Sequence, residues 1–96
     1  MKNLEEIRNI IGQHRQVLDK RFKVKEIALF GSYVRGEQDE KSDLDVLVNF
    51  QEPVGFLFIH LADFLEELLK MKVDLVTEDG IKANRWEYIK EELTYV

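Results

Sequence analysis

Apolar residues recur along the chain in two rhythms, one typical of helices and one typical of strands. Three segments have helical spacing, the last of them only weakly amphipathic: residues 3–20, 56–70 and 81–93. Three shorter apolar runs are typical of strands: residues 24–30, 44–50 and 73–77. In the second of these runs Leu44, Val46, Val48 and Phe50 alternate, which predicts one buried face.

Residues at the ends of these segments support the division. Asn3 followed by Glu6 resembles a capping box, with Asn in place of Ser or Thr. Gly31 interrupts the chain after the first strand, and we expect a helical turn over residues 32–35 that Gly36 caps. The order helix, strand, turn, strand, helix, strand, helix predicts an α/β (α+β) fold, with a small mixed sheet flanked by helices.

Composition excludes several classes of protein. The 96 residues suit a single domain spanning 1–96. Fourteen basic against nineteen acidic residues leave a net charge of -5, which argues against a nucleic-acid partner held by charge alone. The chain has no cysteine, hence no disulfide framework or thiolate chemistry. We expect a soluble, cytoplasmic protein without membrane contact, because its N-terminus has no apolar signal region and no run approaches ~18 apolar residues.

Three aspartates lie in or beside predicted strands, where acidic residues are usually depleted. Asp43 and Asp45 are two residues apart, so they point to the same face of an extended chain with Cα atoms roughly 6.6 Å apart. Asp74 interrupts the apolar run of the third strand. If the two strands are neighbours, the three carboxylates form an oxygen-rich cluster suited to Mg²⁺ or Mn²⁺. The alternative is that the acids simply face water.

A second candidate site lies between the first strand and the helical turn. Gly31 allows the backbone to approach a phosphate closely, and Ser32 adds a hydroxyl donor. If Gly31 is exposed, a branched side chain there should abolish nucleotide binding and leave the fold intact. Arg35 either meets a phosphate or forms a surface ion pair, and Ser42 either joins the site or caps a turn.

Taken together, these residues resemble the signature of the DNA polymerase β-like nucleotidyltransferase superfamily. The resemblance rests on Gly31-Ser32, on Arg35-Gly36 after the helical turn, on Asp43-Leu44-Asp45 in the next strand and on Asp74 in a later one. It is strongest to the minimal nucleotidyltransferases (MNT), and it covers nearly the whole chain. It implies that the chain is the palm-like module of this superfamily.

The resemblance also implies a role for each site residue. Asp43, Asp45 and Asp74 are expected to be catalytic and to hold two Mg²⁺ ions, with Mn²⁺ as an alternative. Gly31, Ser32, Arg35 and Ser42 are expected to bind the nucleoside triphosphate, for which we expect ATP. The implied reaction is attack of a hydroxyl on the α-phosphorus, which expels pyrophosphate.

The partner expected from the resemblance is a HEPN-domain protein. In such a toxin–antitoxin pair this chain is the antitoxin, an enzyme that transfers AMP to a hydroxyl of the toxin. The alternative is a catalytically idle antitoxin that neutralises its partner by binding alone. A third reading, an acidic structural domain without a ligand, leaves the Gly-Ser pair and the three acids as coincidences. Homo- or hetero-oligomers are both compatible with the sequence.

Overall fold

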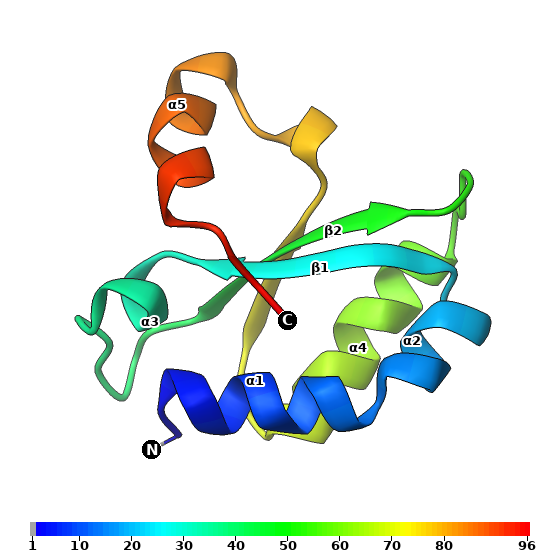
Figure 1. Cartoon of the computed structure of the whole chain (residues 1–96), viewed down its shortest axis with the longest axis horizontal. Helices are drawn as coiled ribbons and strands as arrows, with labels where there is room; N and C mark the ends of the chain where they lie inside the picture. Colours follow the sequence, from blue (N-terminus) through cyan, green and yellow to red (C-terminus); the bar gives the residue numbers. More distant parts are fainter. Residues whose placement is uncertain (1) are drawn as a thin grey trace.

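The computed structural model describes residues 2–96 and shows a four-stranded sheet with helices on both faces (Figure 1). The strands are β1 (Val24–Phe30), β2 (Leu44–Phe50), β3 (Val73–Val76) and β4 (Thr94–Tyr95). The helices are α1 (Leu4–Gln13), α2 (Arg15–Lys20), α3 (Ser32–Arg35), α4 (Leu57–Leu69), α5 (Ala83–Glu92) and the 3-10 turn η1 (Glu78–Gly80). The strand order is β3-β2-β1-β4, with β2 and β3 parallel and the other pairs antiparallel. The predicted α/β (α+β) fold with a mixed sheet is confirmed.

The two faces of the sheet carry different layers. Figure 1 shows α1, α2 and α4 together on one face and α5 on the other. Successive side chains of β2 point to opposite faces of the sheet. Leu44, Val46 and Val48 are buried against the layer formed by α1, α2 and α4. Between them Leu47 points the other way, into a smaller cluster with Ala28, Phe30 and Ile89 of α5. Asp45 lies on this second face, because it alternates with the residues of the first.

The predicted bounds of the first two strands are confirmed, but the single helix over residues 3–20 is wrong. The helix breaks at His14, whose backbone leaves the helical region at φ -108° and ψ 21°. Nδ1 of His14 donates to the Ile10 carbonyl oxygen at 2.9 Å, the acceptor that a continuous helix gives to the His14 backbone N–H. The predicted capping box is present, since Asn3 Oδ1 accepts from the Glu6 N–H at 2.9 Å.

In the C-terminal part, α4, β3 and α5 are each one to three residues shorter than predicted, and an additional strand is present. The last two-residue strand, β4, was not predicted, and it pairs with the middle of β1 through Ala28 and Leu29. This pairing holds the end of α5 close to the sheet, where Glu92 contacts Gly31. Among the helices of residues 2–96, none combines the length and the apolar character that crossing a membrane requires.

Candidate active site

Two of the three predicted acids, Asp45 and Asp74, lie on neighbouring strands, on the face of the sheet that α5 covers. Asp45 of β2 pairs in register with Asp74 of the parallel strand β3. Asp43 precedes β2 by one residue, in the turn that leads into the strand, and its charge reaches Asp45. Asp43 and Asp74 are exposed, whereas Asp45 is half-buried. The strand neighbourhood that the acid cluster required is therefore present in the fold.

Asp45 has the most perturbed ionisation in the site. Burial of its carboxyl group, with smaller contributions from the charges of Asp74 and Asp43 and from hydrogen bonding to Asp74, raises its pKa from 3.8 to about 6. Arg85 of α5 acts in the opposite direction and lowers it. Crowded carboxylates of this kind favour either a proton or a cation between them.

Gly31 lies directly over the Asp45 carboxylate. A Cβ at Gly31 would overlap Asp45 Oδ2 and lie 3.0 Å from its Cγ. The Gly31 backbone also has φ 81° and ψ -154°, a conformation that is essentially restricted to glycine. Gly31 is buried, so the exposure on which an intact fold with a branched side chain depended is not present. Close approach of backbone to carboxylate requires glycine at this position.

A carboxylate of α5 already occupies the donors near Gly31. Glu92 Oε1 accepts from the Gly31 N–H at 3.0 Å and from Arg35 Nη1 at 3.1 Å. Its second oxygen, Oε2, accepts from the same guanidinium nitrogen at 3.1 Å. Arg35 additionally donates through Nε to Glu37 at 3.0 Å. Two of the predicted nucleotide-binding residues therefore bind an anionic group of the chain itself.

The two predicted serines lie in different surroundings. Ser32 is half-buried and opens α3, next to Gly31. Ser42 lies in the loop before β2, where its Oγ accepts from the Asp39 N–H at 3.0 Å and donates to Asp39 Oδ1 at 3.3 Å. The hydroxyl of Ser42 thus caps the turn that leads to Asp43, as in the second of the two interpretations that the sequence allowed.

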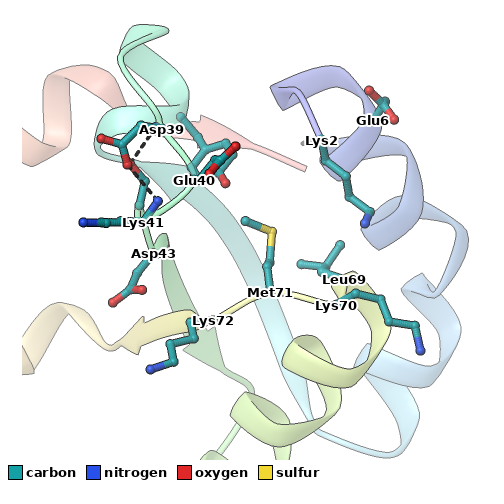
Figure 2. Close-up of a pocket in the computed structure, with 12 residues that line it drawn as sticks. Lys2, Glu6, Asp39, Glu40, Lys41, Asp43, Leu69, Lys70, Met71 and Lys72 are labelled. Atoms are coloured by element: carbon teal, nitrogen blue, oxygen red, sulfur yellow. Dashed lines mark hydrogen bonds between the residues drawn. The ribbon is translucent and has the colours of Figure 1, made fainter.

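Two cavities are lined by five of the predicted site residues, whereas Ser32 and Asp74 line neither. The smaller, of about 230 Å³, is lined by Gly31, Arg35 and Asp45 together with Arg85, Tyr88 and Glu92 of α5. The larger, of about 890 Å³, adjoins Ser42 and Asp43 and lies between the start of α1, the loop before β2 and the turn from α4 to β3. Figure 2 shows Lys41, Asp43 and Lys72 at one end of this larger cavity and Lys2 and Lys70 at the other.

The carboxylate oxygens of the three aspartates suit a hard divalent cation, although their side chains do not point at one common position. Carboxylate oxygens are the ligands that Mg²⁺ and Mn²⁺ prefer. Within residues 2–96, no three Asp, Glu, His or Cys side chains come close enough together to form a complete metal site. Asp45 and Asp74 are in register on neighbouring strands, and Asp45 experiences the negative charges of both Asp74 and Asp43.

Sequence reasoning missed the contribution of α5. Arg85 and Glu92 line the same cavity as Asp45, yet they lie in the weakly amphipathic segment without a recognisable motif. Glu92 is 61 residues away from Gly31 along the chain. No local pattern signals a contact across such a separation, so only the folded chain reveals it.

Known proteins resemble this chain over its whole length. Residues 11–96 match the nucleotidyltransferase domain family. The protein adenylyltransferase MntA of Thermococcus cleftensis is 46% identical over 97 residues, spanning 100% of this chain and 98% of the relative. A structure provisionally described as a minimal nucleotidyltransferase superposes with a TM-score of 0.81 at 33% identity, covering 99% of this chain and 97% of the other. A chain of a toxin–antitoxin complex solved with AMP-PNP gives a TM-score of 0.70 at 26% identity, covering 91% of this chain and 71% of the other.

Proposed function

Because this chain belongs to the nucleotidyltransferase domain family, we propose that it transfers AMP from ATP to a hydroxyl group of a partner protein. The partner proposed is a HEPN-domain toxin, which makes this chain the antitoxin of the pair. The name of the Thermococcus relative supports the choice of AMP and of a protein acceptor. The similar toxin–antitoxin complex with AMP-PNP supports the nucleotide and the type of assembly.

One observation carries the proposal: the anion donors Gly31 and Arg35 line the same cavity as Asp45. The Gly31 N–H and the Arg35 guanidinium both point at a bound carboxylate, which shows that they can hold a negatively charged oxygen. Directly beneath Gly31 lies Asp45, in register with Asp74. A triphosphate bound by the donors therefore lies beside the acids that the chemistry needs.

The donors are assigned to the phosphates that leave. Gly31 and Ser32 would bind the β- and γ-phosphates, and Arg35 would add a positive charge to the same groups. Each donor is fixed by the fold: Gly31 by its glycine-specific backbone, and Ser32 and Arg35 by the short helix α3. Ser42 is assigned an indirect role, because its hydroxyl shapes the turn before Asp43.

The acids are assigned to two divalent cations and to the attacking hydroxyl. Asp43, Asp45 and Asp74 would hold the ions, Mg²⁺ or Mn²⁺, which when bound neutralise charge on the attacking and leaving oxygens. Asp74 is exposed on the edge strand β3, where an acceptor hydroxyl can reach it from solvent. The acceptor oxygen bonds to the α-phosphorus, the bond to pyrophosphate breaks, and Asp74 accepts the hydroxyl proton.

The test is incubation with the HEPN-domain product of the neighbouring gene. The two proteins are mixed with Mg²⁺ and each α-labelled nucleoside triphosphate in turn, and the partner is measured by label transfer and intact mass. We expect the partner to gain the mass of AMP with ATP alone. Asp45→Asn should abolish the gain, whereas the matched control Asp63→Asn, an exposed residue of α4 on the other face, should not.

Two outcomes would contradict the proposal. Transfer that continues in folded Asp45→Asn would remove the acids from the reaction. Full suppression of the toxin by folded Asp45→Asn, without any gain in mass, would establish the alternative of an antitoxin that acts by binding alone.

A further inference from the structure

Glu92 occupies the donors to which the proposed function assigns the triphosphate. Its carboxylate accepts from the Gly31 N–H at 3.0 Å and from Arg35 Nη1 at 3.1 Å. A backbone N–H together with a guanidinium is also the set of donors that a phosphate oxygen takes. A carboxylate and a phosphate cannot both bind these donors, because their like charges repel at this distance.

We propose that the Glu92 carboxylate stands in for a phosphate group in the nucleotide-free protein, and that Glu92 thereby sets the affinity for the triphosphate. This inference rests on the proposed function, since it takes Gly31 and Arg35 to be phosphate donors. When the triphosphate binds, Glu92 is displaced and both donors pass from its carboxylate to the phosphates. Glu92 thus weakens nucleotide binding through the proposed phosphate donors Gly31 and Arg35.

The exchange needs only the side chain of Glu92 to move. The backbone of α5 is fixed on one side by Ile89, which packs against Ala28, Phe30 and Leu47. Directly after Glu92, β4 pairs with β1, and the Val96 N–H donates to the Ile27 carbonyl oxygen at 3.1 Å.

The Glu92 side chain retains 21% of its exposure, so rotation about its own bonds can carry the carboxylate into water. The helix itself can stay in place.

The same helix also supplies a cation to the cavity. Arg85 precedes Glu92 by seven residues, two helical turns, and both line the cavity beside Asp45. After Glu92 has left, Arg35 and Arg85 remain as the cations of this cavity. The displacement therefore removes one of the two carboxylates that line the cavity, which favours binding of a polyanion there.

The expected change in triphosphate affinity follows from competition between Glu92 and the phosphates for the same donors. If the Glu92 contact forms in about 70–90% of nucleotide-free molecules, the apparent Kd for the triphosphate rises about three- to tenfold, because only the remaining molecules can bind. Glu92→Gln keeps the shape of the side chain and removes its charge. We therefore expect this variant to bind Mg²⁺-ATP about three- to tenfold more tightly than the parent chain.

The experiment is calorimetric titration of the full chain, its Glu92→Gln variant and its Glu91→Gln variant with Mg²⁺-ATP and with Mg²⁺-tripolyphosphate. Glu91 is the matched control, because it is exposed on the same helix and its replacement changes the net charge equally. We expect Glu92→Gln to increase the affinity for both ligands by the same factor. Glu91→Gln should change either affinity by less than about twofold. In NMR spectra, the Gly31 amide resonance should move on ATP addition to the parent chain and start from a shifted position in Glu92→Gln.

The outcomes separate the inference from the proposed function. Equal affinity of the parent chain and Glu92→Gln for ATP overturns the inference and leaves the function standing. Weaker binding by Glu92→Gln also overturns it, since Glu92 then positions Arg35 for the substrate. If neither protein binds ATP, the proposed function fails and the inference fails with it.

Discussion

The carboxylate of Asp45 fills the space in which a side chain of Gly31 would lie. A Cβ at Gly31 would overlap Asp45 Oδ2, and Gly31 adopts a backbone conformation, φ 81°, that other residues rarely tolerate. The end of β1 and the acidic residue of β2 therefore constrain each other. The same contact that places Gly31 beside the proposed phosphate position also restricts the half-buried carboxylate of Asp45.

The first prediction tests this contact through stability. Gly31→Ala should destabilise the chain by about 1–3 kcal/mol through backbone strain alone, with a further loss from overlap with Asp45. Adding Asp45→Ala should restore only the stability that the overlap removed, because the backbone strain at position 31 remains. Urea unfolding of the single and double variants measures the coupling between the two sites.

The control for this series is Gly12→Ala in α1. Beyond the adjacent residues and the nearby backbone of α1 itself, no atom lies within 4 Å of a Cβ placed there, so alanine should stabilise the helix by about 0.5–1 kcal/mol. Strictly additive effects of Gly31→Ala and Asp45→Ala would show that the two residues do not constrain each other.

The second prediction separates metal binding from folding. Asp45→Asn should leave the metal-free thermal stability unchanged or slightly higher, because it relieves repulsion from Asp74 and Asp43. It should remove the stabilisation that Mg²⁺ and ATP add to the parent chain, about 2.7 kcal/mol at a ligand concentration of 100 Kd. Nucleotide transfer should fall by about two orders of magnitude or more. Differential scanning calorimetry with and without Mg²⁺-ATP checks the first two effects.

A clear drop in metal-free stability for Asp45→Asn would instead identify Asp45 as an acid that the fold requires. Asp63→Asn, which removes the same charge from the exposed surface of α4, serves as the reference for a change unrelated to the site.

The third prediction concerns pH. Burial and the neighbouring acids raise the pKa of Asp45 to about 6, so the native chain retains a proton that the unfolded chain releases near pH 4. The unfolded state therefore binds fewer protons between these values, and the contribution of Asp45 to stability falls as pH rises from about 4 to 6 and is level above. After allowance for solvent screening of this half-buried group, the change is about 1 kcal/mol.

The measurement is the free energy of unfolding of the parent chain minus that of Asp45→Asn, in chelator, from pH 4 to 8. This difference in free energy should be most favourable to the parent chain at the acidic end, fall between about pH 4 and 6, and be level above. A difference that does not vary with pH would contradict the raised pKa. Because protons compete with cations for the carboxylate, stabilisation by Mg²⁺-ATP should also weaken as pH falls below about 6.

The fourth prediction concerns the start of α1. Asn3 and Glu6 form a reciprocal capping box, so Asn3→Ala should destabilise the chain by about 1 kcal/mol and Asn3→Gly by only a few tenths. Asn9→Ala, at an exposed position within the same helix, should be neutral or slightly stabilising because alanine favours helix. Equal effects of Asn3→Ala and Asn9→Ala in urea unfolding would show that the cap contributes nothing.

The sequence alone determined those features that depend on near neighbours in the chain. Alternation of apolar residues predicted the bounds of β2 and placed Asp43 and Asp45 on one face. Asn3 and Glu6 predicted the cap of α1, and Gly36 predicted the end of α3, which it closes in the left-handed conformation at φ 72°. Backbone hydrogen bonds and side-chain alternation act over a few residues, so local patterns are sufficient to reveal them.

The tertiary structure decided what depends on residues distant in sequence. The pairing of β2 with β3, which brings Asp74 into register with Asp45, follows from the passage of the chain through α4 between the two strands. The contact of Glu92 with Gly31 requires α5 to pack on the sheet and β4 to pair with β1. These contacts form only when the whole chain buries its apolar faces together, and no spacing within one segment encodes such a collective result.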